Sequence, residues 1–476
     1  MEHVDLLITH GTVLPMTSSD GSFLTDAAVA VKGRYIVDVG STRTLTESYT
    51  ASKRIDAGGC IVMPGFVDAH FHTAQQLLRG QIDAIWKTEG KAFPVWRNYL
   101  IPFERSLTEE DVYLGGIIAY LNMLSVGTTA FAEAGGPHCG AMIRAAIDSG
   151  IRGVFTTSTN LEILTEDDQV PGDITQCKDT IIAKNEELFS KWDGEADGRI
   201  RMWIAMNQIT VSSEALVRAV ADFASMHRCG VHIHLCEGVY EIQHTLEKWG
   251  KRPAEVFHDF GLFENPVLAA HAVLLSDEEL QILAEHHVGV AHCVKGNFHL
   301  PGPPKVHLML GQGMPVGVGS DGASGGAIGT LQRLIITRIA IDSHFASPYM
   351  HRGLLTDYDL VRMATCLGAE AIGLGNVSGT VEVGKEADIV IIDASSSEGF
   401  PCEDPYFLLV NSLTSNDVRS TIVAGQVLME NRRLKIGDFD EIETRCRKRM
   451  PFILERFSEF RHKRRCRADA SARLRR

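Results

Sequence analysis

The sequence predicts an α/β protein, a (β/α)8 TIM barrel joined to a small β-sandwich domain built from both chain ends. Short β patterns broken by glycines fill residues 4–60, strand and helix patterns alternate through 61–374, and β patterns return after Gly375. Alternating strands and helices are typical of a parallel sheet covered by helices. The two flanking β segments pair most economically into one small sheet.

Apolar periodicity marks the helices of the central region, each separated from the next by an apolar, strand-like run. The expected helices are 109–126, 139–149, 213–229, 240–249, 276–286 and 356–374. The predicted organisation is a sandwich from 1–60 and 375–435, a barrel over 61–374, and a helical, basic tail over 436–476.

The composition is that of a globular chain. Hydrophobic residues make up 45% of its 476 residues, and mean hydropathy is near zero. No apolar run approaches the length of a membrane helix, and the start lacks the basic residues of a signal peptide, so we expect a cytoplasmic protein without a membrane partner. The ten cysteines lie singly, which indicates reduced thiols rather than disulfides or cysteine metal ligands.

Charge argues against a nucleic-acid partner. The net charge is −14, and no basic face is evident before the tail. Residues 461–476 hold eight Lys/Arg against the single Asp469. Such a run is either a solvated or disordered end, or a segment that docks on an acidic surface of its own oligomer or of another partner.

The most informative pair of residues is His70 and His72. Side chains alternate across a strand, so histidines separated by one residue point the same way and can reach one metal ion. The apolar run 60–67 before them predicts a strand buried on both faces, with a bend at Pro64-Gly65. An ordinary pair of polar core residues is the alternative.

Further ligand candidates end three later strand patterns, at His234, His271 and Asp321. A parallel barrel gathers the carboxyl ends of its strands around one mouth, which brings residues distant in sequence to one ion. Together with His70 and His72, these positions predict a metal site at that mouth.

These residues resemble the amidohydrolase superfamily, and within it the metal-dependent aminohydrolase branch of S-adenosylhomocysteine, guanine and cytosine deaminases and triazine hydrolases. The matching motifs are Pro-Gly-Phe-Val-Asp-Ala-His-Phe-His at 64–72, Gly127-Thr128-Thr129, His234-Leu235-Cys236-Glu237, His271, Asp321-Gly322, and 379–388. The resemblance implies the predicted barrel and sandwich, a homodimer or higher homo-oligomer, and one divalent ion on residues matching His70, His72, His234 and Asp321.

Three imidazoles and a carboxylate suit Zn²⁺, and Fe²⁺ would accept the same set. Members with two metals carry a lysine or an acidic residue at the end of the fourth strand. The corresponding segment 204–208 has neither, which predicts one metal.

Three residues are candidates for catalysis. Glu237 lies beyond the strand that ends at His234 and is expected to shuttle a proton, although it also suits a helix start. The ion is expected to bind and activate a water molecule. Asp321 would take the first proton of this water, and His271 would orient the resulting hydroxide, or else bind the ion. His232 has the parity of His234 and is expected to hydrogen bond to the site or to be a satisfied core histidine.

Substrate contacts are expected from five residues: Gln75, Asn207, His292, Asn297 and Trp96. Gln75 matches a triazine hydrolase glutamine. His292 and Asn297 match the family pattern after strand seven, although Lys295-Gly296 departs from it. Trp96 could stack on a planar ring. Helix-surface polarity for Gln75, a buried structural histidine for His292 and an ordinary helix face for Trp96 are the alternatives.

The expected function is a zinc-dependent deaminase that replaces an exocyclic amine of a small-molecule nitrogen heterocycle with hydroxyl and releases ammonia. Nucleoside deaminases usually end strand four with Gly-Pro-His, and Asn207-Gln208 here favours a smaller ring whose edge is read by amides. The alternatives are a hydrolase that expels an alkylamine or halide from a triazine-like ring or opens a cyclic amide, and a metal-free binding scaffold.

Overall fold

The computed structural model describes most of the chain. The described residues are 1–91, 95–156, 162, 177–297, 302–326, 329–351, 353–395 and 399–474, with side chains as far as Arg461.

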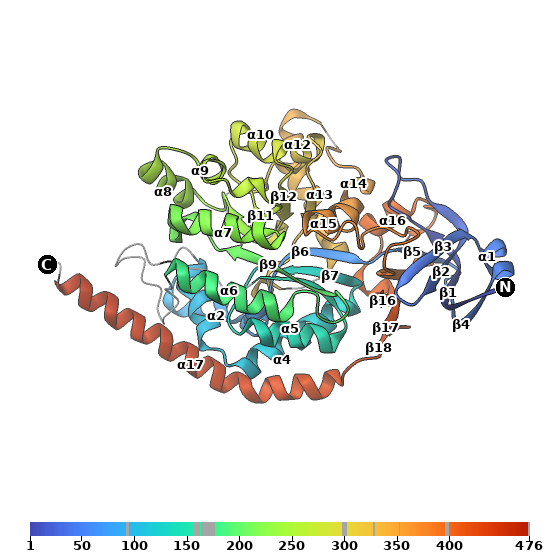
Figure 1. The fold of residues 1–476 in the computed structure, drawn as a ribbon, viewed down its shortest axis with the longest axis horizontal. Coiled ribbons are helices and arrows are strands. Elements are labelled where there is room, and N and C mark those ends of the chain that lie inside the picture. Colours follow the sequence, from blue (N-terminus) through green and yellow to red (C-terminus); the bar gives the residue numbers. More distant parts are fainter. Residues whose placement is uncertain are drawn as a thin grey trace.

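The centre of the molecule is a parallel sheet that closes on itself (Figure 1). β13 pairs with β12, and β14, three residues further along the chain, pairs with β6. Together, these two short strands take the place of one strand and close the barrel between β12 and β6. Its strands are β6 (Phe66–His72), β7 (Thr128–Glu133), β8 (Arg152–Thr156), β9 (Ile200–Met206), β10 (Val231–Leu235), β11 (Val267–His271), β12 (Gly289–His292), β13 (Val316–Val318) and β14 (Asp321–Gly322).

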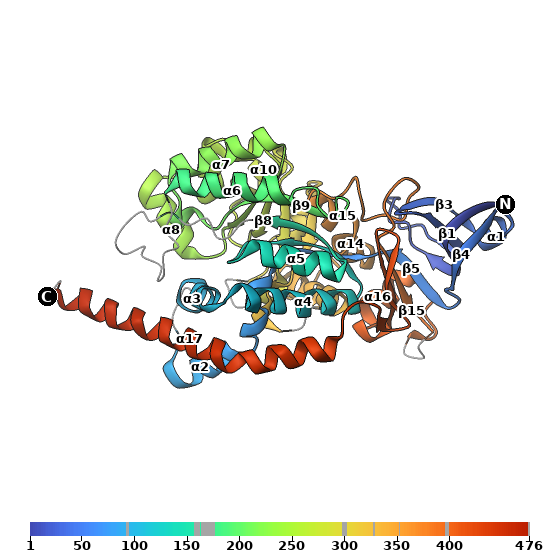
Figure 2. The ribbon, with the colours of Figure 1, turned by 60° about the horizontal axis from the view of Figure 1, so that its bottom comes forward.

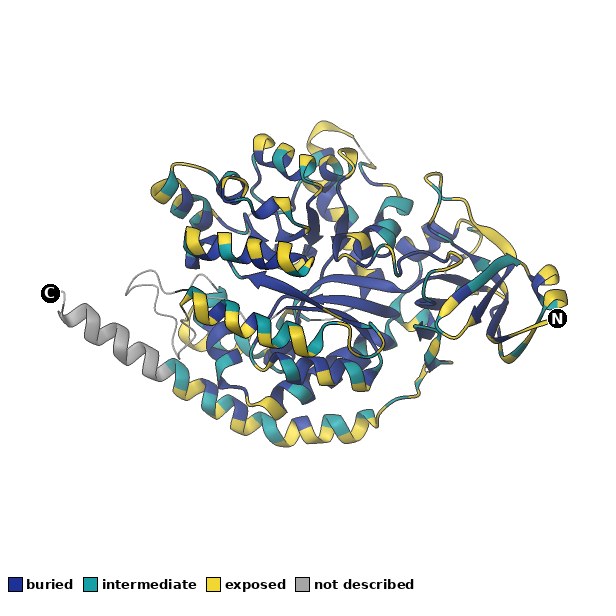
Figure 3. Cartoon of the chain, viewed as in Figure 1, coloured by how far each residue is buried: buried dark blue, intermediate teal, exposed yellow. Residues whose placement is uncertain are grey.

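Helices surround this barrel, and the strands between them are buried (Figure 3). Several of these helices begin after a residue whose side-chain hydroxyl accepts a backbone N–H of the first turn. Thr108 and Asp111 form such a capping box on the helix Glu109–Ser125, and Ser213 caps the helix Glu214–His227. The helices are α2 (Gln81–Glu89), α3 (Ile101–Ser106), α4 (Glu109–Ser125), α5 (Cys139–Ser149), α6 (Lys178–Trp192), α7 (Glu214–His227), α8 (Val239–Trp249), α9 (Pro253–Asp259), α10 (Asp277–Glu285), α11 (Val294–Asn297), α12 (Val306–Gly311), α13 (Thr330–Ile341), α14 (Asp357–Met363) and α15 (Cys366–Ala371).

A second, mixed sheet draws its strands from both chain ends, as the sequence predicted (Figure 2). Its order is β18-β17-β16-β15-β5-β1-β2-β3, with β4 also on β1. The elements are β1 (Glu2–Val13), β2 (Leu24–Lys32), β3 (Tyr35–Ser41), β4 (Tyr49–Asp56), β5 (Cys60–Pro64), β15 (Ile389–Asp393), β16 (Val418–Val423), β17 (Gln426–Glu430) and β18 (Arg433–Leu434), with α1 (Thr42–Ser48) and α16 (Pro405–Asn411) beside them.

The run 60–67 is not one strand, as the sequence suggested, but two strands in different sheets. Pro64 pairs with Ile389 in the mixed sheet, and Phe66 pairs with Thr128 in the barrel. Gly65 makes this change possible, because a β-carbon there would lie 2.1 Å from Cγ2 of Thr129. The bend predicted at Pro64-Gly65 is therefore the crossing between sheets.

A buried ion pair also joins the two sheets. Arg152, on β8, is fully buried, and its Nε donates to Oδ2 of Asp388 at 2.7 Å. Asp388 also accepts the backbone N–H of Ala424 at 2.7 Å, beside β16. One carboxylate thus fixes barrel strand β8 against the end of β16 in the second sheet.

The chain finishes in α17 (Phe439–Leu474), which runs along α4 and α3 (Figure 2). Arg449 and Arg456 both contact the buried carboxylate of Asp111, and Arg461 pairs with Glu89 of α2. The basic side chains after Arg461, for which two alternatives were open, lie outside the described ones. No helix among the described residues has the length and apolarity needed to cross a bilayer.

Candidate active site and metal centre

The structure brings the histidine pair and Asp321 together at the carboxyl end of the barrel. His70 and His72 lie on β6, and Asp321 begins β14, which pairs with β6. Nε2 of His70 lies 3.6 Å from Oδ1 of Asp321, and Nε2 of His72 lies 3.8 Å from the same oxygen. Strand alternation aims both imidazoles at one carboxylate, as predicted.

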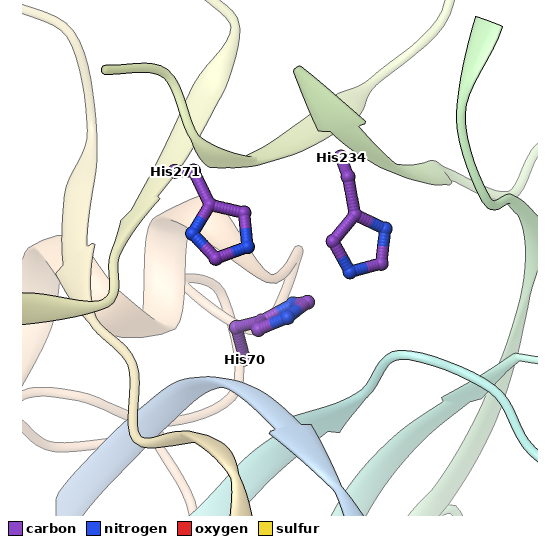
Figure 4. A group of neighbouring side chains, drawn as sticks. All are labelled: His70, His234 and His271. Carbon is purple, nitrogen blue, oxygen red and sulfur yellow. The ribbon is translucent and has the colours of Figure 1, made fainter. Parts of the chain in front are cut away.

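His234 and His271 complete the cluster from β10 and β11. Figure 4 shows their rings and that of His70 converging, with donor atoms of the three within 4.8 Å of one another. Nε2 of His234 is 3.4 Å from Nε2 of His72. The five residues predicted around the ion therefore form two overlapping groups that share His70, one with His234 and His271 and the other with His72 and Asp321.

The hydrogen bonds leave suitable nitrogens for a cation. Nδ1 of His234 lies 2.9 Å from the backbone carbonyl of Asn207, which only accepts, so Nδ1 carries the proton and Nε2 keeps its lone pair. Nδ1 of His70 is 2.8 Å from Nε2 of His232, whereas Nε2 of His70 is buried without a hydrogen-bond partner among the described residues. A buried, unpaired nitrogen beside a carboxylate fits a divalent metal ion.

Protonation states fit the same ion. Burial, followed by the charge of His70, lowers the pKa of His72 to about 3, so this imidazole is neutral near pH 7. Burial alone would raise the pKa of Asp321, but the close approach of the His70 imidazole, with His271 and His72 nearby, holds it below its usual range. Neutral histidines and an ionised aspartate are the forms that bind metals.

Two of these residues have a strained backbone. His271 has φ of 72° and Asp321 has φ of 62°, both in the left-handed region that non-glycine residues seldom adopt. Nδ1 of His271 also lies 2.9 Å from Oδ1 of Asn297, an acceptor, which fixes the proton on Nδ1 and leaves Nε2 for the site. Such strain is characteristic of functional sites.

Asp68 and Arg333 form a buried ion pair near the cluster that the sequence did not predict. Asp68 accepts the N–H of Ser320 at 2.9 Å and the guanidinium of Arg333 at 3.1 Å. It thus fixes the residue before Asp321 against β6. Asp68 lies within the 64–72 motif, and this position is the sequence signal that could have identified it.

Glu237 follows β10, and its carboxylate is held by groups that sequence reasoning did not identify. Its Oε2 accepts hydrogen bonds from Nε2 of Gln208 and from the hydroxyl of Tyr240. Its own N–H donates to Glu241 at 3.0 Å. Burial is the main cause that raises the pKa of Glu237 above its ordinary value.

Three of the predicted substrate contacts are buried at this end of the barrel with polar atoms unpaired among the described residues. These atoms are Oε1 of Gln75, Nδ2 of Asn297 and both ring nitrogens of His292. Nε2 of Gln75 donates to Glu104 at 2.9 Å, and burial raises the pKa of Glu104 to about 7. Their contact with substrate stays a prediction.

Asn207 and Trp96 each make a contact in the site that the sequence did not predict. Asn207 offers its carbonyl to His234, and its neighbour Gln208 is the amide that faces Glu237. The indole N–H of Trp96 donates to the hydroxyl of Tyr240 at 3.2 Å. Neither observation tests whether these side chains touch a substrate.

Comparison with known proteins agrees with this geometry. Residues 61–428 match the amidohydrolase family. A 5-methylthioadenosine/S-adenosylhomocysteine deaminase of Symbiobacterium thermophilum is 33% identical over 93% of this chain and 97% of its own. One of Acetivibrio thermocellus is 31% identical over 92% of this chain and 97% of its own.

Among solved structures, an adenosine deaminase of Xanthomonas campestris with bound zinc superposes with a TM-score of 0.85 at 25% identity, covering 95% of this chain and 99% of its own. The family match spans most of the chain and includes every residue of the histidine and aspartate cluster. This chain therefore belongs to the amidohydrolase family.

Proposed function

We propose that this protein is a hydrolase of non-peptide carbon–nitrogen bonds that replaces an exocyclic amine of a nitrogen heterocycle with hydroxyl and releases ammonia. The observation that carries the proposal is the clustering of His70, His72, His234 and Asp321 in two overlapping groups at the barrel mouth. Glu237 lies just beyond the strand that holds His234. The names of the deaminases similar to this chain support the reaction.

We assign one Zn²⁺ per chain to His70, His72, His234 and Asp321, a donor set that Fe²⁺ would also accept. The zinc of the similar adenosine deaminase supports this choice. When bound, such an ion supplies Lewis acidity that lowers the pKa of water from about 16 to about 7. His271, whose Nε2 faces the cluster, then orients the attacking oxygen by accepting a hydrogen bond.

Proton transfers fall to two carboxyl groups. Asp321 stays ionised near neutrality and can accept the first proton. Glu237, whose pKa is raised by burial, is suited to deliver one proton to a ring nitrogen and a second to the departing amine, both replaced by the two protons of the attacking water. Amine and water are consumed, and hydroxyl product and ammonia are formed.

The substrate class follows from the ring and the amine. The preference for a small ring drawn from Asn207-Gln208 is weakened, because the amide of Gln208 is engaged by Glu237 and Tyr240. The names of the similar proteins support aminopurine nucleosides. These compounds therefore head the panel of substrates, ahead of free aminopurines, aminopyrimidines, pterins and aminotriazines.

The test is ammonia-coupled turnover on this panel with metal-loaded enzyme. Ammonia release that requires metal supports the proposal. Release of alkylamine or halide without ammonia would favour the second hydrolase, and no turnover by a protein that also retains no zinc would favour a binding scaffold. A cytoplasmic location and a homodimer or higher homo-oligomer stay predictions, for which light scattering checks the assembly.

A further inference from the structure

One hydroxyl group connects Glu237 to two other parts of the barrel mouth. The hydroxyl of Tyr240 lies 3.1 Å from Oε2 of Glu237, 2.8 Å from Nε2 of Gln208 and 3.2 Å from Nε1 of Trp96. An amide N–H and an indole N–H can only donate, so the oxygen of Tyr240 accepts both. Its single hydrogen is left for Glu237, and the direction of every bond is fixed.

The ring of Tyr240 is folded back over its own chain. A β-carbon on Gly238 would lie 2.6 Å from Cε1 and 2.9 Å from Cδ1 of this ring. Gly238 has φ of −150°, which any residue adopts, so the glycine is required by the ring and not by the backbone. The absence of a side chain at 238 thus allows Tyr240 to reach Glu237.

Trp96 approaches from a different barrel strand. It lies in the connection that follows β6, on a π-helical turn, η2 (Trp96–Leu100), and packs against Ile101 and Val211. Val211 and Gln208 follow β9, whereas Glu237 and Tyr240 follow β10. The connections after three strands therefore meet at the hydroxyl of Tyr240.

We infer that Tyr240 is a positioning residue for Glu237, held in place by Trp96. This inference rests on the proposed function for the role of Glu237. The hydroxyl of Tyr240 and the amide of Gln208 both donate to Oε2, which orients the carboxyl group and leaves the transferred proton to Oε1. Trp96 thus acts on the carboxyl group through Tyr240, and not by stacking on substrate.

The test compares Tyr240→Phe with the wild-type holoenzyme. Removing one hydrogen bond to a charged group is expected to lower kcat about tenfold, while KM stays within about twofold and zinc content is unchanged. A crystal structure of the variant is expected to show the Glu237 carboxyl group turned from its wild-type position. Tyr113→Phe is the matched control, because it removes a hydroxyl that donates to Asp148 at 2.8 Å between α4 and α5.

The inference is overturned if Tyr240→Phe matches Tyr113→Phe in kcat and leaves Glu237 in place. Should Tyr240→Phe fail to fold, Gly238→Ala displaces the same ring, and Trp96→Phe removes the indole N–H donor while keeping an aromatic ring against Ile101 and Val211. Both are expected to lower kcat without changing zinc content, and unchanged kcat in both would overturn the role. If the wild type releases no ammonia from any substrate, the proposed function fails, and the position of Glu237 in the two crystal structures still decides the role of Tyr240.

Discussion

The backbone of Gly296 and the carboxylate of Asp321 lie so close that no side chain fits between them. A β-carbon on Gly296 would be 2.1 Å from Oδ2 and 3.1 Å from Cγ of Asp321. The Lys295-Gly296 sequence, which departs from the family pattern, thus has a physical reason in this chain. It gives the aspartate the space in which it meets His70 and His72.

Gly296→Ala should therefore displace Asp321 and damage the site. A ligand moved by ~1 Å is expected to reduce kcat/KM about 100-fold. Zinc content, measured by mass spectrometry, should fall with it. Gly311→Ala is the control, because a β-carbon there meets nothing within 4 Å. Full zinc content in Gly296→Ala would contradict the assignment of Asp321 as a ligand.

Glu237→Gln should separate proton transfer from metal binding. The amide keeps the shape of the carboxyl group but cannot exchange protons, so turnover is expected to fall by about 10² to 10⁴-fold with zinc retained. Glu247→Gln, on the exposed face of α8, controls for the loss of one charge. Near-normal turnover by Glu237→Gln would exclude the shuttle.

Removal of the metal should lower thermal stability as well as activity, because a ligand that binds only the folded state stabilises it. Scanning calorimetry of the wild type with and without chelator should show a lower Tm after chelation. His70→Ala should start with little metal and show no such change. His351→Ala, at an exposed position, should behave as wild type. A Tm of His70→Ala that still responds to chelator would count against His70 as a ligand.

Glu133 should make stability depend on pH. Burial raises its pKa to about 8, whereas in the unfolded chain it titrates near 4.5. Between these values the folded state holds a proton that the unfolded state has lost, so the free energy of unfolding falls as pH rises, by at most about 1.4 kcal/mol per pH unit. The contribution is fully present below pH 4.5.

Glu133→Gln mimics the protonated form and should flatten this decline. Urea unfolding of wild type and variant from pH 5 to pH 9 would show the two curves diverging as pH rises, with the variant the more stable at high pH. Parallel curves would mean that Glu133 is ionised in the folded protein.

Arg152→Met should destabilise the whole fold, because it leaves the buried carboxylate of Asp388 without its cation. The expected loss is about 3–5 kcal/mol, measured by denaturant unfolding. Arg218→Met removes an exposed pair with Glu214 and should cost less than about 1 kcal/mol. Equal losses would show that the buried pair does not join the sheets.

The sequence predicted those parts of the fold and site that depend on local pattern. Strand alternation placed His70 and His72 on one face, and strand ends located His234 and His271. Asp321, expected at the end of a strand, instead begins β14 after a break that follows Val318. Helix α6 was missed, although Ile181 on it is buried and Leu188 and Phe189 pack against the hydrophobic cores. The contact of Gln208 with Glu237 was missed because the two residues follow different strands, β9 and β10, which no local spacing reveals. Tyr240, three residues after Glu237, was also missed.

The crossing at Gly65 has a consequence for how this enzyme can be dissected. The N–H of Gly65 bonds to Asp388 and that of Phe66 to Gly127, so adjacent peptide groups are committed to different sheets. No linker separates the two sheets at this point. A truncated variant that starts at β6 would leave β15 without β5, its partner in the mixed sheet. The mixed sheet therefore holds the start of the barrel in place, and the two cannot be separated by cutting the chain between them.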